Sequence, residues 1–206
     1  MEVKVYEGKE LETILEEVKE DLQITDNDFV YKKEEIKGSL LKKGSTKVYV
    51  YGLTDIQEYA KDILSELTKG MGIEITFESK IRENQITIKM YSNNNSLLIG
   101  VQGRTLQALT TILRQIIMNK ISVYPNIYLD VENYKDKQQA RIERLAKNLA
   151  RDVVKTKIEV KMDNMNAYER RIVHNILSNN SKVQTVSEGE EPNRHVVIKP
   201  VVKEDE

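Results

Sequence analysis

Apolar and polar positions alternate along residues 1–53 in a way that predicts one small α+β unit. An apolar stripe at helical spacing marks one helix, and three short runs of alternating residues mark strands. A turn region with two glycines separates the last two strands. The predicted elements are strands at 3–6, 29–35 and 47–51 and a helix over 11–22.

Residues 54–134 carry a second set of periodic segments. Gly52-Leu53-Thr54 is expected to bridge the two sets, and Asp55 to cap the next helix. Helices are predicted over 56–69, 96–99 and 105–120, and strands over 73–78, 85–91 and 126–132, which gives the order α-β-β-α-α-β. The predicted core face of the last helix consists of Leu106, Leu109, Ile112, Leu113, Ile116 and Ile117.

Residues 135–206 predict two helices followed by a hairpin. The first helix has an apolar face made of Ile142, Leu145, Ala146, Leu149 and Val153. A second helix is expected over 167–177, and the hairpin strands over 183–187 and 194–199. The fold class is therefore α+β, with three small domains at 1–53, 54–134 and 135–206.

Composition narrows the class of protein. The chain has no cysteine, so disulfides and thiolate metal sites are excluded, and we expect no cofactor and no metal. It contains no apolar run long enough to cross a membrane, and its first residues lack the pattern of a signal peptide, so the cytoplasm is expected. The net charge is −1, but it divides into about −3 over residues 1–53 and +3 over 135–206.

The excess positive charge gathers on the first helix of the C-terminal domain. Five basic residues recur at helical spacing on the face opposite the apolar one: Arg141, Arg144, Lys147, Arg151 and Lys155. A solvated helix surface is the common explanation for such a stripe. A face of one sign, without the alternating acids of an ordinary solvent face, favours an anionic ligand.

A Gly-x-x-Gly turn is the second candidate site. It joins two predicted helices and comprises Gly100, Val101, Gln102, Gly103 and Arg104. Glycines let the backbone approach a ligand closely, and the free N–H groups of the following helix favour an anion. No Lys-Ser/Thr follows the second glycine, so a nucleotide P-loop is excluded. A nucleic-acid backbone is the expected guest.

The third candidate is an Arg/His pair. Arg170 and His174 are four residues apart, so both project from one face of the predicted second helix. A guanidinium can bind a phosphate through two N–H groups, and an imidazole can donate to a phosphate or stack on a base. Together with the basic helix, the pair is expected to form a C-terminal surface that binds nucleic acid.

Two runs of sequence extend these motifs. Residues 96–109 closely resemble the KH core of the Jag family (SpoIIIJ-associated, KhpB or EloR proteins), although the family loop usually carries a basic residue where this chain has Val101. Residues 166–192 closely resemble the R-three-H (Arg-x-x-x-His) domain of the same family. Residues 1–51 resemble its N-terminal domain more loosely, and Lys37-Gly38-Ser39-Leu40-Leu41 matches the start of a family motif.

The resemblance implies a bacterial protein that binds single-stranded RNA, or single-stranded DNA, and regulates genes after transcription in connection with cell-envelope growth and division. It also implies a small single-KH protein as partner, and residues 1–51 could dock an envelope-associated protein. A solvated turn remains the simpler interpretation of Lys42-Lys43-Gly44.

Two other functions stay open. The chain has two histidines, and His174 with His195 could act as acid and base in a metal-independent ribonuclease. Alternatively, the N-terminal domain could make the protein an interaction adaptor. No catalytic residue and no metal ligand is predicted, because no His/Asp/Glu cluster has ligand spacing. The leading prediction is a non-enzymatic RNA-binding protein.

Overall fold

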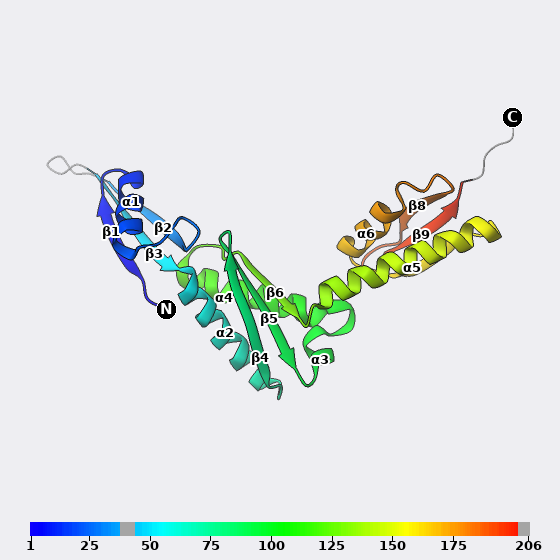
Figure 1. The fold of residues 1–206 in the computed structure, drawn as a ribbon, viewed down its shortest axis with the longest axis horizontal. Coiled ribbons are helices and arrows are strands. Elements are labelled where there is room, and N and C mark those ends of the chain that lie inside the picture. Colours follow the sequence, from blue (N-terminus) through cyan, green and yellow to red (C-terminus); the bar gives the residue numbers. More distant parts are fainter. Residues whose placement is uncertain (38–43, 202–206) are drawn as a thin grey trace. The chain divides into compact units, whose positions relative to one another are not determined.

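The computed structural model describes residues 1–37 and 44–201 and has the predicted α+β fold (Figure 1). Helices flank three separate three-stranded sheets. The chain forms two compact units, Met1–Glu132 and Asn133–Glu206, and the first unit contains two of the sheets. The sequence motif of Lys37–Leu41 and the basic turn Lys42-Lys43-Gly44 lie largely outside the described residues, so the interpretation of both stays a prediction.

The first sheet is antiparallel, and helix α1 (Leu11–Leu22) covers one of its faces. Its strands are β1 (Lys4–Gly8), β2 (Phe29–Ile36) and β3 (Ser45–Gly52), in the spatial order β1-β3-β2. The apolar stripe of α1 places Ile14 and Val18 against alternate residues of the strands, and these form the buried core together with Phe29, Val48 and Val50.

Helix α2 (Leu53–Gly70) follows β3 without the bridge that the sequence suggested. Leu53 is buried, and its backbone N–H donates to the carbonyl of Asp28 at 2.8 Å. These contacts hold the first residue of the helix in place, so Gly52 is the cap and Asp55 lies within the first turn. The expected Asp55 cap was therefore wrong, because tertiary packing decides where the helix begins.

The second sheet has the element order predicted for residues 54–134. Strands β4 (Ile75–Arg82) and β5 (Gln85–Ser92) are antiparallel, and β6 (Ile127–Val131) runs parallel to β5. Two helices lie between β5 and β6, α3 (Asn95–Ile99) and α4 (Arg104–Ile121). Residues of α2, α4, β5 and β6 are buried, and α4 packs on both α2 and β6. The buried residues of α4 are Leu106, Leu109, Leu113, Ile117 and Ile121.

Ile112 does not belong to these buried residues. It is 45% exposed, because it lies one position from Leu113 and so about 100° around the helix from it. Ile116, the neighbour of buried Ile117, is only half-buried for the same reason. The predicted core face of α4 was thus too wide, because it included Ile112 and Ile116, which lie at the margin of the buried face.

The C-terminal unit contains one strand that the sequence analysis missed. Helices α5 (Tyr134–Thr156) and α6 (Ala167–Leu177) pack on a sheet of β7 (Val160–Asn164), β8 (Val183–Glu188) and β9 (His195–Pro200). The sheet is antiparallel in the order β7-β9-β8, so β9 is central and the predicted hairpin is only part of it. Ile158, Val160 and Met162 alternate with charged residues, and that period of two is the signal for β7.

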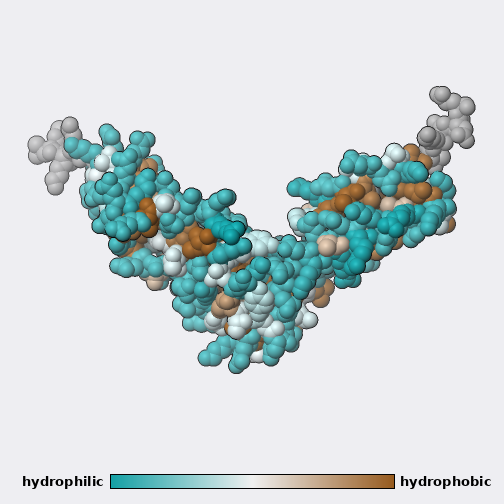
Figure 2. Space-filling model, in the orientation of Figure 1, coloured by the Kyte–Doolittle hydropathy of each residue, from teal (hydrophilic) through white to brown (hydrophobic). Residues whose placement is uncertain are grey.

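Each compact unit has its own apolar interior beneath a mainly hydrophilic surface. In the view of Figure 2, hydrophobic residues gather in separate patches among hydrophilic ones. None of the helices in the described part of the chain is long and apolar enough to span a membrane.

Candidate nucleic-acid interface

The Gly-x-x-Gly turn forms a tight connection between α3 and α4. Gly100 and Gly103 have φ values of 70° and 77°, which glycine adopts without strain. The N–H of Gly100 donates to Ser96 O at 2.9 Å, and that of Gly103 donates to Gly100 O at 3.3 Å. A Cβ on Gly100 would overlap the hydroxyl of Thr105, so the first glycine is required by space as well as by conformation.

Several side chains of this turn are exposed to solvent. Val101 is 76% exposed, and Gln102 and Arg104 are also exposed. Helix α4 begins at Arg104, and no side chain caps its first N–H groups. The N–H of Arg104 donates to Val101 O, so an acceptor from outside can reach only the N–H groups that follow it, and Arg104 places a cation beside them.

The basic stripe of the C-terminal unit lies on the solvent side of α5. Its members span roughly 120° of the helix circumference, opposite the buried residues Ile142, Ala146 and Val153. Glu143 and Asp152, the only carboxylates between residues 141 and 155, lie to either side of the stripe. We call the stripe the α5 basic face: Arg141, Arg144, Lys147, Arg151 and Lys155, all exposed.

The α5 basic face carries uncompensated charge. Within the described ranges, none of its five residues takes part in an ion pair. Leu145, predicted on the apolar face, is instead 42% exposed at its margin, and Ala150 takes a buried position. The repulsion among five like charges is relieved most directly by an anionic ligand that follows the helix.

Arg170 is committed to contacts inside the C-terminal unit. Its side chain is buried, and Nη1 donates to Met165 O and to Glu191 Oε1, both at 2.8 Å. Arg170 thereby connects the start of α6 to the segment between β8 and β9. The outward projection expected from the sequence is not what the geometry gives, because the arginine lies on the helix face that packs on the sheet.

His174 also faces the sheet. Nδ1 lies 2.7 Å from Thr185 Oγ1, and Nε2 lies 2.8 Å from Ser187 Oγ, so both ring nitrogens have hydroxyl partners on β8. Burial and, secondarily, the positive charge of Arg170 lower the pKa of His174 below 6.5. The imidazole is therefore neutral at physiological pH.

The structure thus separates two groups of residues that the sequence analysis combined. Arg170 and His174 form a cluster between α6 and β8, whereas the α5 basic face points away from the sheet. The two histidines are separated as well. Ser187 pairs with Val196 and Glu188 with His195, so His174 approaches one face of the sheet while His195 lies on the other.

Other contacts at the start of α6 were not foreseen. Asn166 Oδ1 accepts from Glu169 N, and Glu169 Oε2 accepts from Asn166 N, each at 3.0 Å. Gln138 of α5 donates to the second oxygen of Glu169 at 3.1 Å. The Asn-x-x-Glu spacing before an apolar run is the sequence signal for such a capping box. It fixes the helix that carries Arg170 and His174.

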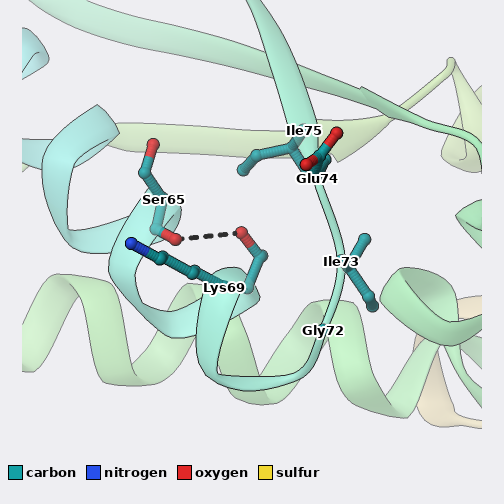
Figure 3. A pocket seen from close by; sticks show the side chains of 7 residues that line it. Ser65, Lys69, Gly72, Ile73, Glu74 and Ile75 are labelled. Carbon is teal, nitrogen blue, oxygen red and sulfur yellow. Dashed lines mark hydrogen bonds between the residues drawn. The ribbon is translucent and has the colours of Figure 1, made fainter.

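A hollow of about 520 Å³ opens where α2 ends and β4 begins (Figure 3). Ser65, Lys69 and Glu74 are among its lining residues, and Thr68 Oγ1 donates to Ser65 O within α2 at 3.3 Å. None of the site residues predicted from the sequence lines it. Among the residues that the structure describes, no group of three or more His, Cys, Asp and Glu side chains could hold a metal ion.

Comparisons with known proteins add to this geometry. The family model of the R-three-H domain matches residues 140–200, which include most of α5 and all of α6. The chain is 36% identical over 145 residues to the RNA-binding protein KhpB of Clostridium symbiosum, covering 69% of this chain and 65% of that protein.

Two further relatives carry the same name. The KhpB protein of Lactiplantibacillus plantarum is 36% identical over 138 residues (66% of this chain, 42% of that protein), and that of Bacillus subtilis is 38% identical over 123 (57% and 59%). The chain thus spans less than two thirds of each of the three relatives. Their agreement with each other and with the R-three-H match shows that the chain belongs to the Jag (KhpB) family.

Proposed function

We propose that this protein binds single-stranded RNA and releases it unchanged. One observation carries the proposal. The α5 basic face presents five exposed, positively charged side chains, and none of them takes part in an ion pair among the described residues. The face lies within the segment matched by the R-three-H model. The relatives' name, RNA-binding protein KhpB, supports the same ligand.

The α5 basic face suits a phosphate backbone. Its five charges follow a helix of 23 residues, so a strand laid along the helix meets several cations in succession. Each phosphate that is neutralised releases condensed counterions, which is the main driving force for binding without sequence preference. Contacts between cations and phosphates supply affinity, but they do not distinguish one base from another.

The Gly-x-x-Gly turn is the proposed second contact. Gly100, Val101, Gln102, Gly103 and Arg104 lie at the start of α4, and residues 54–134 are proposed to act as the KH domain. Each contact alone binds weakly. Because one chain carries both, the first contact raises the effective concentration of the second, and the pair supplies the affinity.

The R-three-H pair has a positioning role in this proposal. Arg170 binds Glu191 and so fixes α6 to the segment between β8 and β9, whereas His174 binds the hydroxyls of Thr185 and Ser187 and so fixes α6 against β8. Direct phosphate contact by Arg170 remains the alternative. The salt dependence of RNA binding separates the two roles, as set out in the Discussion.

A ribonuclease built on His174 and His195 is the weaker alternative. Acid–base cleavage requires both imidazoles to reach one substrate. The two residues lie on opposite faces of the sheet, and His195 is buried with Nδ1 2.9 Å from Asn193 O. This separation supports a non-enzymatic protein.

Incubation with end-labelled single-stranded RNA tests the function directly. We expect the RNA to shift into a complex and to be recovered at full length, with or without a divalent metal ion. RNA shortening by the wild type that is lost in His174→Gln would make the protein a nuclease. Absence of a complex at low salt would contradict RNA binding.

The finer role follows the family resemblance. The protein is proposed to act in the cytoplasm as a regulator after transcription, linked to cell-envelope growth and division, with the domain limits 1–53, 54–134 and 135–206. A small single-KH protein is its proposed partner, and residues 1–51 would dock an envelope-associated protein. Crosslinking of bound RNA in cells, together with capture of partners by the full chain and by a chain lacking residues 1–51, tests these assignments.

A further inference from the structure

Strand β9 ends at the same end of the C-terminal unit as helix α5. Val160 of β7 pairs with Ile198 of β9 in antiparallel register, so the residues after Ile198 lie beside those before Val160. The residues before Val160 come directly from α5, which ends at Thr156. An ion pair of 3.8 Å between Lys199 and Glu159 joins the two segments at this place. The chain therefore leaves β9 next to the C-terminal end of α5 (Figure 1).

That end of α5 carries two cations of the α5 basic face. Arg151 and Lys155 lie one helical turn apart and are exposed, and neither takes part in an ion pair among the described residues. Lys199 of the neighbouring strand is already compensated, because Glu188 lies 2.7 Å and Glu159 3.8 Å from its ammonium group. An anion that reaches this end of the unit can therefore neutralise Arg151 and Lys155.

The sequence that follows β9 supplies such anions. The backbone N–H of Val201 donates to Lys182 O at 3.0 Å, which fixes the point where the chain leaves the sheet. Residues 202–206 lie outside the described residues and read Val-Lys-Glu-Asp-Glu. We call the three acids of this run the acidic segment: Glu204, Asp205 and Glu206. An extended chain of five residues spans at most about 17 Å, which suffices for the segment to reach the nearby end of α5.

We propose that the acidic segment docks on Arg151 and Lys155 of its own chain and competes there with RNA. Two observations favour this occupant, the opposite sign of the charges and the exit of the chain beside the end of α5. A short tether also keeps the segment at an effective concentration of about the millimolar range. The competition with RNA rests on the proposed function, whereas the contact itself does not.

The contact is expected to be weak and sensitive to salt. Exposed ion pairs contribute little individually, and dissolved salt screens them further. Two or three such pairs on a short tether should leave the end of α5 open in roughly one fifth to one half of the molecules. RNA then binds this open fraction, so its apparent affinity at low salt is lowered about twofold to fivefold.

The contact is tested first without RNA, in the full chain. Because the sequence has no cysteine, a nitroxide can be attached at one chosen position. Asn148→Cys places it on the α5 basic face, since Asn148 is exposed and lies one turn from both Arg144 and Arg151. Glu190→Cys is the control, because it lies in the turn before β9, at the other end of that strand. The nitroxide at position 148 should broaden the amide NMR signals of residues 204–206 at low salt but not at high salt, and the control should not broaden them.

Competition is measured next, with end-labelled single-stranded RNA and folded variants of the full chain. The segment variant carries amides in place of the three acids, Glu204→Gln, Asp205→Asn and Glu206→Gln. The α1 control removes the same charge from three exposed acids of α1, Glu12→Gln, Glu16→Gln and Glu20→Gln. Thermal unfolding confirms that each variant is folded.

The segment variant should bind RNA about twofold to fivefold more tightly than wild type at low salt, and the two should converge at high salt. The α1 control should bind as wild type does. A second background, Arg151→Gln with Lys155→Gln, lacks the proposed docking site. In that background, neutralising the acidic segment should have no further effect on RNA affinity, because the two sets of residues act through one contact.

Several results would overturn the proposal. No broadening from position 148, or equal broadening from both positions, would show that the acidic segment does not dock on α5. Broadening between a nitroxide-labelled chain and a separate isotope-labelled chain would assign the contact to a second copy instead. An equal gain in RNA affinity for the segment variant and the α1 control, or no gain in either, would exclude competition. If wild type does not bind RNA at low salt, the proposed function is wrong, and the NMR measurement alone decides whether the contact exists.

Discussion

Arg170 Nη1 lies 2.8 Å from Glu191 Oε1, which joins α6 to the segment between β8 and β9. The two side chains differ in environment, because that of Arg170 is 10% exposed and that of Glu191 is 60% exposed. The buried partner also donates to Met165 O. The arginine therefore supports the fold of the C-terminal unit through two contacts, the hydrogen bond to Met165 O and the ion pair with Glu191. The ion pair is more exposed to water, because the side chain of Glu191 is exposed.

Replacement of Arg170 should cost more stability than replacement of Glu191. Arg170→Ala leaves Met165 O without its donor and should lower the free energy of unfolding by about 1–3 kcal/mol. Glu191→Gln keeps an acceptor at the turn and should cost less than about 1 kcal/mol, because water screens an exposed ion pair. Urea unfolding of both variants measures this, and equal stabilities would contradict the assigned contacts.

The same arginine variant separates positioning from contact with RNA. If Arg170 only positions α6, Arg170→Ala should leave the slope of log affinity against log salt as in wild type. A slope shallower by about 0.7 would show instead that the guanidinium neutralises one phosphate on a single strand. Binding measured at a temperature well below the unfolding transition of the variant separates loss of a phosphate contact from loss of stability.

His174 should make stability depend on pH. Burial, followed by the charge of Arg170, lowers its pKa in the folded state below 6.5, whereas the unfolded chain keeps the ordinary value. The unfolded state therefore binds more protons in the window between the two values. The free energy of unfolding should fall as pH drops from about 6.5 towards the folded-state pKa, and should level off above that window.

His174→Gln is the matched variant, because glutamine can still bond to the β8 hydroxyls but does not titrate. Its stability should change less between pH 5 and pH 7.5 than that of wild type, in about the range where histidine titrates. Chemical unfolding at several pH values gives both curves. Parallel curves for the two proteins would contradict the lowered pKa.

Gly100 should not tolerate a side chain. Gly100→Ala must place a Cβ against Thr105 at φ 70°, so it should destabilise the first unit by at least about 1–2 kcal/mol. Gly70→Ala is the control, since a Cβ there meets nothing within 4 Å and the residue ends α2. That variant should be neutral or slightly stabilising. Similar losses in thermal unfolding for both glycines would argue against a specific need for glycine at position 100.

Negative charge at the tip of the same turn should weaken RNA binding. Val101→Asp with Gln102→Asp places two carboxylates beside the start of α4, and aspartate tolerates the positive φ of 54° at position 102. The matched variant carries asparagine at both positions. We expect weaker binding by the Asp pair than by the Asn pair at low salt, and convergence of the two at high salt. Equal affinities at low salt would exclude this turn from the interface.

The sequence predicted most of the secondary structure because periodicity reports which face of an element is buried. It predicted α5 and its basic face directly, since a long helix repeats its pattern over several turns. It missed β7, which has five residues and a register shift between Lys161 and Asn164. It also misplaced the start of α2, where the hydrogen bond from Leu53 to Asp28 decides the boundary.

The candidate sites were predictable to different degrees. Exposure of Val101 and of the α5 basic face follows from local pattern alone. The partners of Arg170 and His174 lie on segments that are distant in the sequence, Glu191 and the hydroxyls of β8. Spacing of four residues places two side chains on one face of a helix, but it does not say whether that face meets solvent or the sheet.

The central claim is that the α5 basic face binds the phosphates of single-stranded RNA. The most direct test is a salt titration of binding for wild type and for Arg144→Gln, Lys147→Gln and Arg151→Gln combined. The control removes the same charge elsewhere, by Lys4→Gln, Lys9→Gln and Lys69→Gln. Loss of three contacts should make the slope shallower by about 2 in the α5 variant, whereas the control should keep the wild-type slope. A wild-type slope in the α5 variant, or an equal change in both, would contradict the account.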